Sequence, residues 1–138
     1  MAKKAKTWAE KMTRPHAPQV RVLDRTFAQH PAGTRMLIST PQEIASFIQD
    51  IPPGKTVAVA EMRDALAHSH RALFTCPLTT GIFLRVAAEE ACERLAQGAA
   101  TDEVTPFWRI VGPKDPLGKK LSCGAEALTR LRRLEGIS

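Results

Sequence analysis

Apolar residues recur at helical spacing after a strong helix-start signal at residues 40–43. Thr40 can cap a helix, Pro41 suits the first helical position, and Glu43 completes a capping box. The apolar positions that follow are Ile44, Phe47, Ile48 and Ile51. This spacing predicts an amphipathic helix that begins at residue 41 and stops before Pro52-Pro53-Gly54.

Two further helices are predicted in the middle of the chain. Residues 58–68 form the first, which would bury Val59, Met62 and Leu66. The second opens at Cys76-Pro77 and continues to residue 97, where Gly98 provides the stop. The apolar stripe predicted for it consists of Leu78, Ile82, Phe83, Val86, Ala87 and Leu95.

The remaining segments have less regular patterns. Residues 105–111 are apolar but interrupted by Pro106, which predicts a strand or a tight turn, and residues 55–57 predict a short extended piece. Residues 126–135 predict a last helix that faces inward through Leu128, Leu131 and Leu134. Residues 7–12 predict a short helix anchored by Trp8, and the prolines of residues 15–31 predict an extended arm.

This order of elements predicts a mostly α protein with short β structure, in two parts. Residues 1–38 would form a basic, partly extended N-terminal arm. Residues 39–138 would form a helical domain in which two consecutive helices, a loop and a last helix are compatible with a winged helix-turn-helix.

The positive charge of the chain lies in the predicted arm. The net charge is +6, and residues 1–35 hold eight Lys and Arg against two acidic residues, whereas residues 36–138 hold twelve of each sign. Such an arm either follows phosphate backbones or is a solvated tail, and composition favours neither. Residues 109–138 form a second basic region, with seven positive and three negative side chains.

The sequence predicts a reduced, cytoplasmic protein. No apolar run approaches the ~20 residues needed to cross a bilayer, and the N-terminus lacks the apolar region of a secretory signal. Cys76, Cys92 and Cys123 are odd in number and are not spaced as C-x-x-C. If the protein binds DNA, it would associate with the bacterial nucleoid.

Three short strings, in order, resemble the alkylguanine-DNA alkyltransferase family. Residues 51–62, IPPGKTVAVAEM, resemble the opening of that family's DNA-binding helix pair; residues 105–112, TPFWRIVG, resemble its active-site segment P-C-H-R-V-V/I-G; and Gly124 with Leu134-Glu135-Gly136 resembles its C-terminal end. Residues 76–83, CPLTTGIF, and Thr105–Arg109 also resemble a group of small bacterial proteins related to this family. The resemblance covers about residues 39–138 and implies the family's C-terminal winged-helix DNA-binding domain.

The same resemblance implies that this chain is not an alkyltransferase. Phe107 stands at the position of the family's nucleophilic cysteine and Trp108 at that of its histidine, while Glu135 keeps the acid. Neither aromatic side chain is a nucleophile, so alkyl transfer at this position is excluded. Val59 replaces the tyrosine that rotates the target nucleotide, and Gly81 replaces the arginine that fills the gap in the base stack.

The candidate base pocket consists of Phe107, Trp108, Arg109, Val59 and Glu135. Phe107 and Trp108 would offer an apolar wall on which a base stacks, or they would simply fill the core of an aromatic-poor domain. The candidate nucleic-acid-binding residues are Thr79, Thr80, Arg85, Lys119, Lys120, Arg130, Arg133, Lys3, Lys4 and Lys6. For Arg85 the alternative is an i,i+4 ion pair with Glu89; for Thr79 and Thr80 it is helix-start capping; and for the basic run it is a solvated face.

The sequence therefore favours a non-catalytic protein that binds double-stranded DNA, either intact or damaged, and that needs no cofactor. The alternative is an RNA- or protein-binding adaptor that reuses the fold, without contact to a membrane. His68, His70 and Cys76 suggest a zinc site, but their spacing fits no standard set and no fourth ligand is evident. Cys76 at a helix start would be either a reactive thiol or a buried, inert one.

Overall fold

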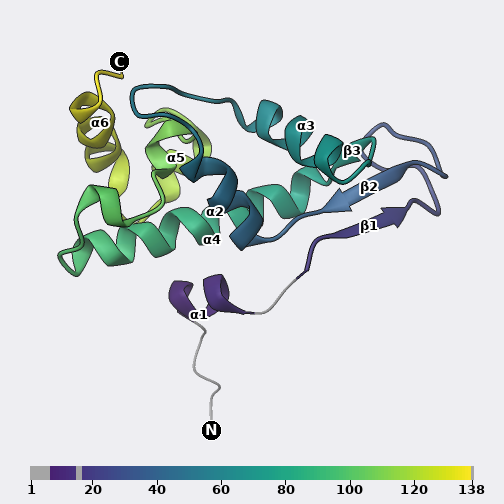
Figure 1. Cartoon of the computed structure of the whole chain (residues 1–138), viewed down its shortest axis with the longest axis horizontal. Helices are drawn as coiled ribbons and strands as arrows, with labels where there is room; N and C mark the ends of the chain where they lie inside the picture. The colour runs from purple at the N-terminus through teal and green to yellow at the C-terminus, as the bar shows by residue number, and fades with distance from the viewer. Residues whose placement is uncertain (1–6, 15–16, 138) are drawn as a thin grey trace, which may run out of the picture.

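The protein is mostly helical with one small β-sheet (Figure 1). The computed structural model describes residues 7–14 and 17–137. The helices are α1 (Trp8–Thr13), α2 (Pro41–Gln49), α3 (Val59–Ser69), α4 (Pro77–Ala96), α5 (Pro116–Lys120) and α6 (Gly124–Leu134). The strands are β1 (Gln19–Val22), β2 (Arg35–Ile38) and β3 (Phe74–Thr75), and two 3-10 turns are η1 (Thr101–Glu103) and η2 (Phe107–Arg109). In Figure 1 the sheet lies toward one end of the long helix α4 and α6 lies toward the other.

The segment predicted as an extended arm forms a β-hairpin over much of its described part. β1 pairs antiparallel with β2, with Gln19 opposite Ile38, and β2 pairs parallel with β3. The sheet order is therefore β1-β2-β3. Leu37 in β2 is fully buried in the core, so β2 packs with the helical part of the chain.

The strongest helix signals of the sequence are confirmed. α2 begins at Pro41, and the side chain of Thr40 accepts a hydrogen bond from the Glu43 amide at 3.1 Å. The carboxylate of Glu43 does not return a bond to the cap. It accepts from Ser39 Oγ at 2.5 Å and contacts His70 Nε2 at 2.5 Å, so it links the start of α2 to the end of α3.

The apolar stripe predicted for α4 is partly wrong. Leu78 and Ile82, in the first turns, are 65% and 54% exposed. Val86 and Ala87 are buried as predicted. The buried face of α4 also includes Thr80, Leu84, Ala88, Glu89, Ala91 and Cys92. This difference arises because α1, α2 and η2 all pack against α4. The buried surface of α4 is therefore wider than a single apolar stripe. Leu134 near the end of α6 is likewise exposed rather than buried.

The segment between α4 and α6 consists of helical turns and loops. All three strands precede α4, and residues 97–123, all of them described, contain η1, η2 and α5 but no strand. The segment 105–111 folds into η2, and Phe107 and Trp108 lie within the central core cluster. α5 was not predicted, because this short helix contains one glycine and two lysines and has no apolar periodicity.

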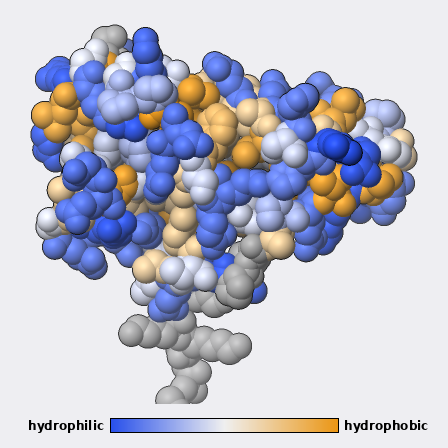
Figure 2. All heavy atoms as spheres, in the orientation of Figure 1, coloured by the Kyte–Doolittle hydropathy of each residue, from blue (hydrophilic) through white to orange (hydrophobic). Residues whose placement is uncertain are grey.

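The outer surface is mixed in character. Figure 2 shows that polar residues cover most of the viewed face, with hydrophobic patches between them. Within the described part of the chain, no helix combines the length and the apolarity that spanning a bilayer requires.

Candidate nucleic-acid interface

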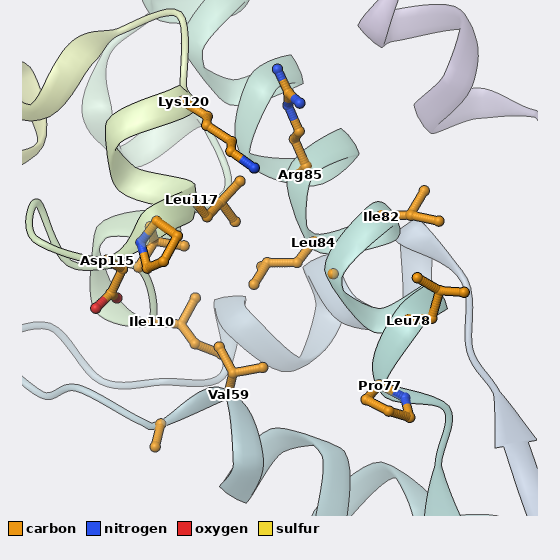
Figure 3. Close-up of a pocket in the computed structure, with 14 residues that line it drawn as sticks. Val59, Pro77, Leu78, Ile82, Leu84, Arg85, Ile110, Asp115, Leu117 and Lys120 are labelled. Carbon is orange, nitrogen blue, oxygen red and sulfur yellow. The ribbon is translucent and has the colours of Figure 1, made fainter. Parts of the chain in front are cut away.

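A groove of about 790 Å³ lies where the beginnings of α3 and α4 face α5 (Figure 3). Its floor is apolar and includes Val59 from α3, Leu84 from α4 and Ile110 just after η2. The other lining residues are Ala58, Pro77, Leu78, Gly81, Ile82, Arg85, Val111, Asp115, Pro116, Leu117 and Lys120. The exposed side chains of Leu78 and Ile82 lie on its α4 side, so apolar surface extends out of the groove.

Positions that are far apart in the sequence meet at this groove. Val59 and Gly81 line it together with Ile110 and Val111, which directly follow η2. In the family that the sequence resembles, the first two positions handle the target nucleotide and the segment near residue 107 carries the chemistry. Val59, Gly81 and the two residues after η2 therefore lie at one groove, whereas Phe107 and Trp108 do not line it.

Two cations and one acid also line the groove. Figure 3 shows Lys120 extending from α5 toward α4, Arg85 on α4, and Asp115 near the start of α5. Asp115 Oδ2 accepts from the Gly112 amide at 2.7 Å, which ties it to the turn before α5.

Arg85 has partners within the protein and also reaches solvent. Its Nε lies 3.7 Å from Glu89 Oε2, so the expected i,i+4 pair is present, and its guanidinium lies 5.5 Å from the centre of the Trp8 ring. The Arg85 side chain nevertheless keeps 41% of its surface exposed, while the Glu89 side chain is almost fully buried. The guanidinium is therefore positioned by its partners and still accessible at the groove.

The candidate base pocket around Trp108 is closed. Phe107 is fully buried and Trp108 is 2% exposed, and their rings meet edge to face with centroids 5.4 Å apart. Neither side chain lines the groove, although Val59 does. Both aromatic side chains fill the core, because an aromatic-poor domain buries the large apolar groups that it has.

Glu135 holds this region together rather than lining a pocket. Its carboxylate accepts from Trp108 Nε1 at 2.8 Å, from Arg109 Nε and Nη2 at 2.9 Å each, and from the Gly54 amide at 2.9 Å. Arg109 also donates to the Ile51 carbonyl at 2.8 Å. The hydrogen bonds from Arg109 are the largest cause that lowers the pKa of Glu135 from 4.5 to about 2. The Glu135 carboxylate is thus ionised at neutral pH, and both of its oxygens accept hydrogen bonds from within the protein.

The threonines at the start of α4 differ in accessibility. Thr80 is 1% exposed and its Oγ1 donates to the Cys76 carbonyl at 2.7 Å, so it is not available to a ligand. Thr79 donates to the same carbonyl at 3.5 Å and is half-buried. Of the two, Thr79 alone keeps surface at the helix start.

The predicted basic residues do not form one continuous face. Arg85 and Lys120 line the groove, but Arg130 lines a different cavity beside Leu95, near the other end of α4. Thr79 and Leu95 are separated by about 24 Å of helix at 1.5 Å per residue. Arg133 lines a further cavity next to Pro113 and Arg132, and Lys119 is exposed on α5. Lys3, Lys4 and Lys6 lie outside the described residues.

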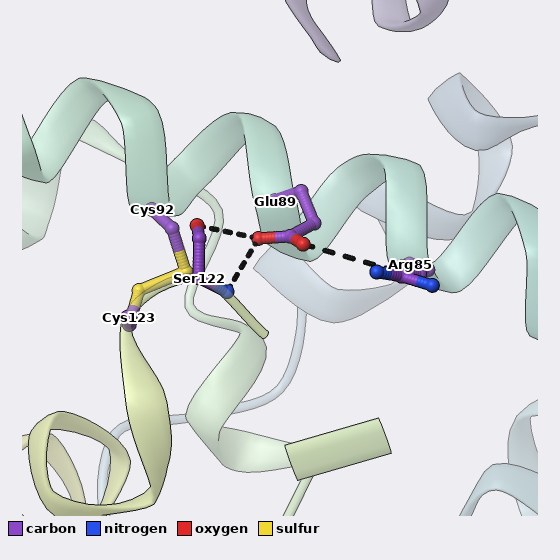
Figure 4. The surroundings of a disulfide bond; sticks show 5 residues. All are labelled: Arg85, Glu89, Cys92, Ser122 and Cys123. Carbon is purple, nitrogen blue, oxygen red and sulfur yellow. Dashed lines mark hydrogen bonds and ion pairs between the residues drawn. A yellow bond between two sulfur atoms is a disulfide. The ribbon is translucent and has the colours of Figure 1, made fainter. Parts of the chain in front are cut away.

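The cysteines are not all free thiols, which corrects the sequence-based expectation. Cys92 in α4 and Cys123 before α6 form a disulfide with Cα atoms 5.6 Å apart (Figure 4). Cys76 is free and buried, so its thiol is shielded from substrates. In residues 7–14 and 17–137, no three His, Cys, Asp or Glu side chains gather as metal ligands, and His68, His70 and Cys76 therefore do not form a site.

Several residues of the groove were not singled out from the sequence. Asp115, Leu117 and Ile110 belong to it, and Leu78 and Ile82 were assigned to the core. Asp115 followed by Pro116 is a helix-start signal that could have revealed α5. Comparisons of the chain with models of protein families, with characterised proteins and with solved structures find no significant match.

Proposed function

We propose that this protein is a non-catalytic DNA-binding protein of the alkyltransferase-like type, which receives duplex DNA at the groove between α3, α4 and α5. In this proposal α3 and α4 serve as the helix pair of a helix-turn-helix domain. The observation that carries it is the meeting of two sets of positions around one groove. The resemblance assigns nucleotide handling to the positions of Val59 and Gly81, and residues 110–111 end the segment that resembles the family's active-site segment.

The chemistry of the groove suits a nucleotide. The two cations on its walls, Arg85 and Lys120, can each neutralise a backbone phosphate. The floor formed by Val59, Leu84 and Ile110 is apolar and can pack against the face of a base. Leu78 and Ile82, exposed on α4, are suited to contact sugars and base edges in a groove of the duplex.

The proposed role is binding without catalysis. Phe107 offers no nucleophile, and it is fully buried in the core. The free thiol of the described chain, Cys76, is buried as well, and the Glu135 carboxylate is engaged by Trp108, Arg109 and Gly54. A protein with these features can hold damaged DNA for other factors, but these groups provide no acceptor for an alkyl group.

The direct test is fluorescence polarisation of short labelled duplexes, with and without an alkylated base, on the wild-type chain and single variants. Binding should weaken by at least about tenfold between about 50 and 200 mM salt, as two phosphate contacts require. Arg85→Gln and Lys120→Gln should each weaken binding and reduce the salt slope by about one.

Arg94→Gln is the matched control. Arg94 is also an arginine on α4 in an i,i+4 pair with a glutamate, at 3.8 Å from Glu90 Oε1, but it lies near the other end of the helix. It should leave the affinity and the salt slope within about twofold of the wild type. Equal losses in Arg94→Gln and Arg85→Gln would contradict a groove-centred site.

A second candidate, an adaptor that binds RNA or a protein, is favoured by one observation. The lining of the groove is largely apolar, and Leu78 and Ile82 extend this surface along α4. Such a surface suits an apolar peptide side chain or unstacked bases as well as a duplex. In the same polarisation assay, single-stranded RNA that binds more tightly than duplex DNA would favour the RNA adaptor.

A further inference from the structure

A second cavity gives solvent access to the disulfide. It measures about 370 Å³, lies between the C-terminal half of α4 and α6, and has both Cys92 and Cys123 in its wall. Cys92 is buried at 4% exposure, whereas Cys123 is partly exposed. Of the two cysteines, Cys123 is therefore the more exposed residue.

The guanidinium group of Arg130 belongs to a residue that lines the same cavity. Cys123, Ala127 and Arg130 follow one another at helical spacing, and all three line the cavity from the α6 side. Arg130 is exposed and makes no ion pair with any described acidic residue. The acids of η1, Asp102 and Glu103, line a separate cavity. Arg130 is thus the charged residue in the lining of this cavity.

We propose that this cavity is a thiol-exchange site for small thiols that carry a carboxylate. The thiolate attacks Sγ of Cys123, the Cys92–Cys123 bond breaks, and Cys92 leaves as a thiolate, which yields a mixed disulfide on Cys123. A second thiol molecule attacks that mixed disulfide and releases Cys123. Two small thiols are oxidised to one disulfide, the protein disulfide is reduced, and the two protons end on the cysteine sulfurs. Arg130 attracts the carboxylate and so favours this class of reagent.

Two hydrogen bonds and an ion pair connect the exchange site to the groove (Figure 4). Ser122, next to Cys123, donates its amide at 2.9 Å and its hydroxyl at 2.6 Å to Glu89 Oε1, and Glu89 is the ion-pair partner of Arg85. Opening the disulfide removes a constraint on residues 122–123. The hydrogen bonds from Ser122 to Glu89 then weaken, and Glu89 positions Arg85 less firmly. This consequence for DNA binding rests on the proposed function, whereas the exchange itself does not. The sequence predicts a reducing compartment, in which disulfides are usually transient. A disulfide that opens and closes by exchange is consistent with that prediction.

The test measures initial rates of reduction of the oxidised full chain by mercaptoacetate, which is anionic, and by 2-mercaptoethanol, which is neutral. Free thiols are alkylated after each interval and counted by intact mass. Arg130→Gln should slow mercaptoacetate about three- to tenfold and leave 2-mercaptoethanol within about twofold. Arg130→Lys should restore the mercaptoacetate rate. Arg133→Gln should behave as the wild type, because Arg133 lines a different cavity. Peptide mass spectrometry should find the mixed disulfide on Cys123.

Three results would overturn the exchange site: equal slowing of both thiols by Arg130→Gln, no slowing of either, or an adduct on Cys92.

The connection to the groove has its own readout, the NMR resonance of the Arg85 Nε–H group. It should shift on reduction and in oxidised Ser122→Ala, and an unchanged resonance in both would overturn the connection. Duplex binding is measured on the same samples. Absence of DNA binding in both redox forms would reject the proposed function while the thiol rates still decide the exchange site.

Discussion

Glu135 joins three parts of the chain that are distant in sequence. Its carboxylate accepts hydrogen bonds from the Trp108 indole, the Arg109 guanidinium and the Gly54 amide. The sequence identified Trp108 at the histidine position of the resembled family and left the acid without a relay partner. The structure gives that acid a structural task, because it anchors η2 and the loop after α2 to the end of α6. Side-chain pairing of this kind depends on tertiary contacts, so the sequence pattern did not predict it.

The pairing of Glu135 predicts a pH dependence of stability. Its folded-state pKa is lowered from 4.5 to about 2, so the folded protein binds this proton less readily than the unfolded chain. The stabilisation is complete above about pH 4.5 and is lost as the pH falls through about 2. Glu135→Gln should lower the free energy of unfolding at pH 7 by roughly 3 kcal/mol, because it leaves Arg109 without its anion. It should also flatten the pH dependence in that window, as measured by urea unfolding at several pH values.

Glu126→Gln provides the control for this prediction. Glu126 lies exposed in the first turn of the same helix. Its loss should change stability by no more than about 0.5 kcal/mol. If both variants had the same small effect at pH 7, the anchoring role of Glu135 would be wrong.

At the scale of elements, helices with local signals were predictable and elements that depend on distant pairing were not. α2 follows from its cap at Thr40 and its apolar spacing, and α4 from its proline start and Gly98 stop. The hairpin is different, because the alternation of QVRV in β1 covers only four residues and the strand stays largely exposed. β2 also pairs with β3, which lies far along the chain. The same holds for the exposed Leu78 and Ile82, whose environment is set by where α1 and α2 pack.

α5 forms one wall of the groove, and its position depends on a glycine. A Cβ atom on Gly118 would lie 2.0 Å from the carbonyl oxygen of Gly112, so the two backbone segments are in direct contact. Gly118→Ala should lower the free energy of unfolding by about 1–3 kcal/mol, because α5 has to move away. The substitution should also weaken the binding of any ligand at the groove. Thermal and urea unfolding measure the first effect.

Gly81→Ala is the matched comparison. A Cβ at Gly81, within α4, would meet no atom within 4 Å. Alanine is favoured over glycine inside a helix, so this variant should gain up to about 1 kcal/mol. If Gly118→Ala proved as stable as Gly81→Ala, the close contact of α5 with residue 112 would be disproved.

At the scale of the whole molecule, the fold divides the charges that the sequence grouped together. The sequence analysis named Arg85, Lys120 and Arg130 together as candidate nucleic-acid-binding residues, but Arg85 and Lys120 lie at the groove while Arg130 lies near the other end of α4. The sequence also found the positions of the groove, Val59 and Gly81, through the family resemblance. It missed the disulfide, since cysteines 31 residues apart carry no spacing signal that identifies them as a pair.

The disulfide connects α4 to α6 and should contribute to global stability. It closes a segment with a sequence separation of 31 residues, for which loop-closure entropy gives about 3–4 kcal/mol. Reduction with excess dithiothreitol should therefore lower the free energy of urea unfolding by about that amount. The Cys92→Ser, Cys123→Ser double variant should match the reduced wild type and respond no further to dithiothreitol. A wild-type stability that is unchanged by complete reduction would contradict this role.

The claim that the groove receives duplex DNA is tested most directly by an NMR titration. An unlabelled duplex is added to the ¹⁵N-labelled oxidised protein, and amide shifts are followed residue by residue. The largest changes should fall on Leu78, Ile82 and Lys120 at the groove. Changes concentrated instead at residues 92–96 and 127–134, around the second cavity, or no changes at all, would contradict the proposed site.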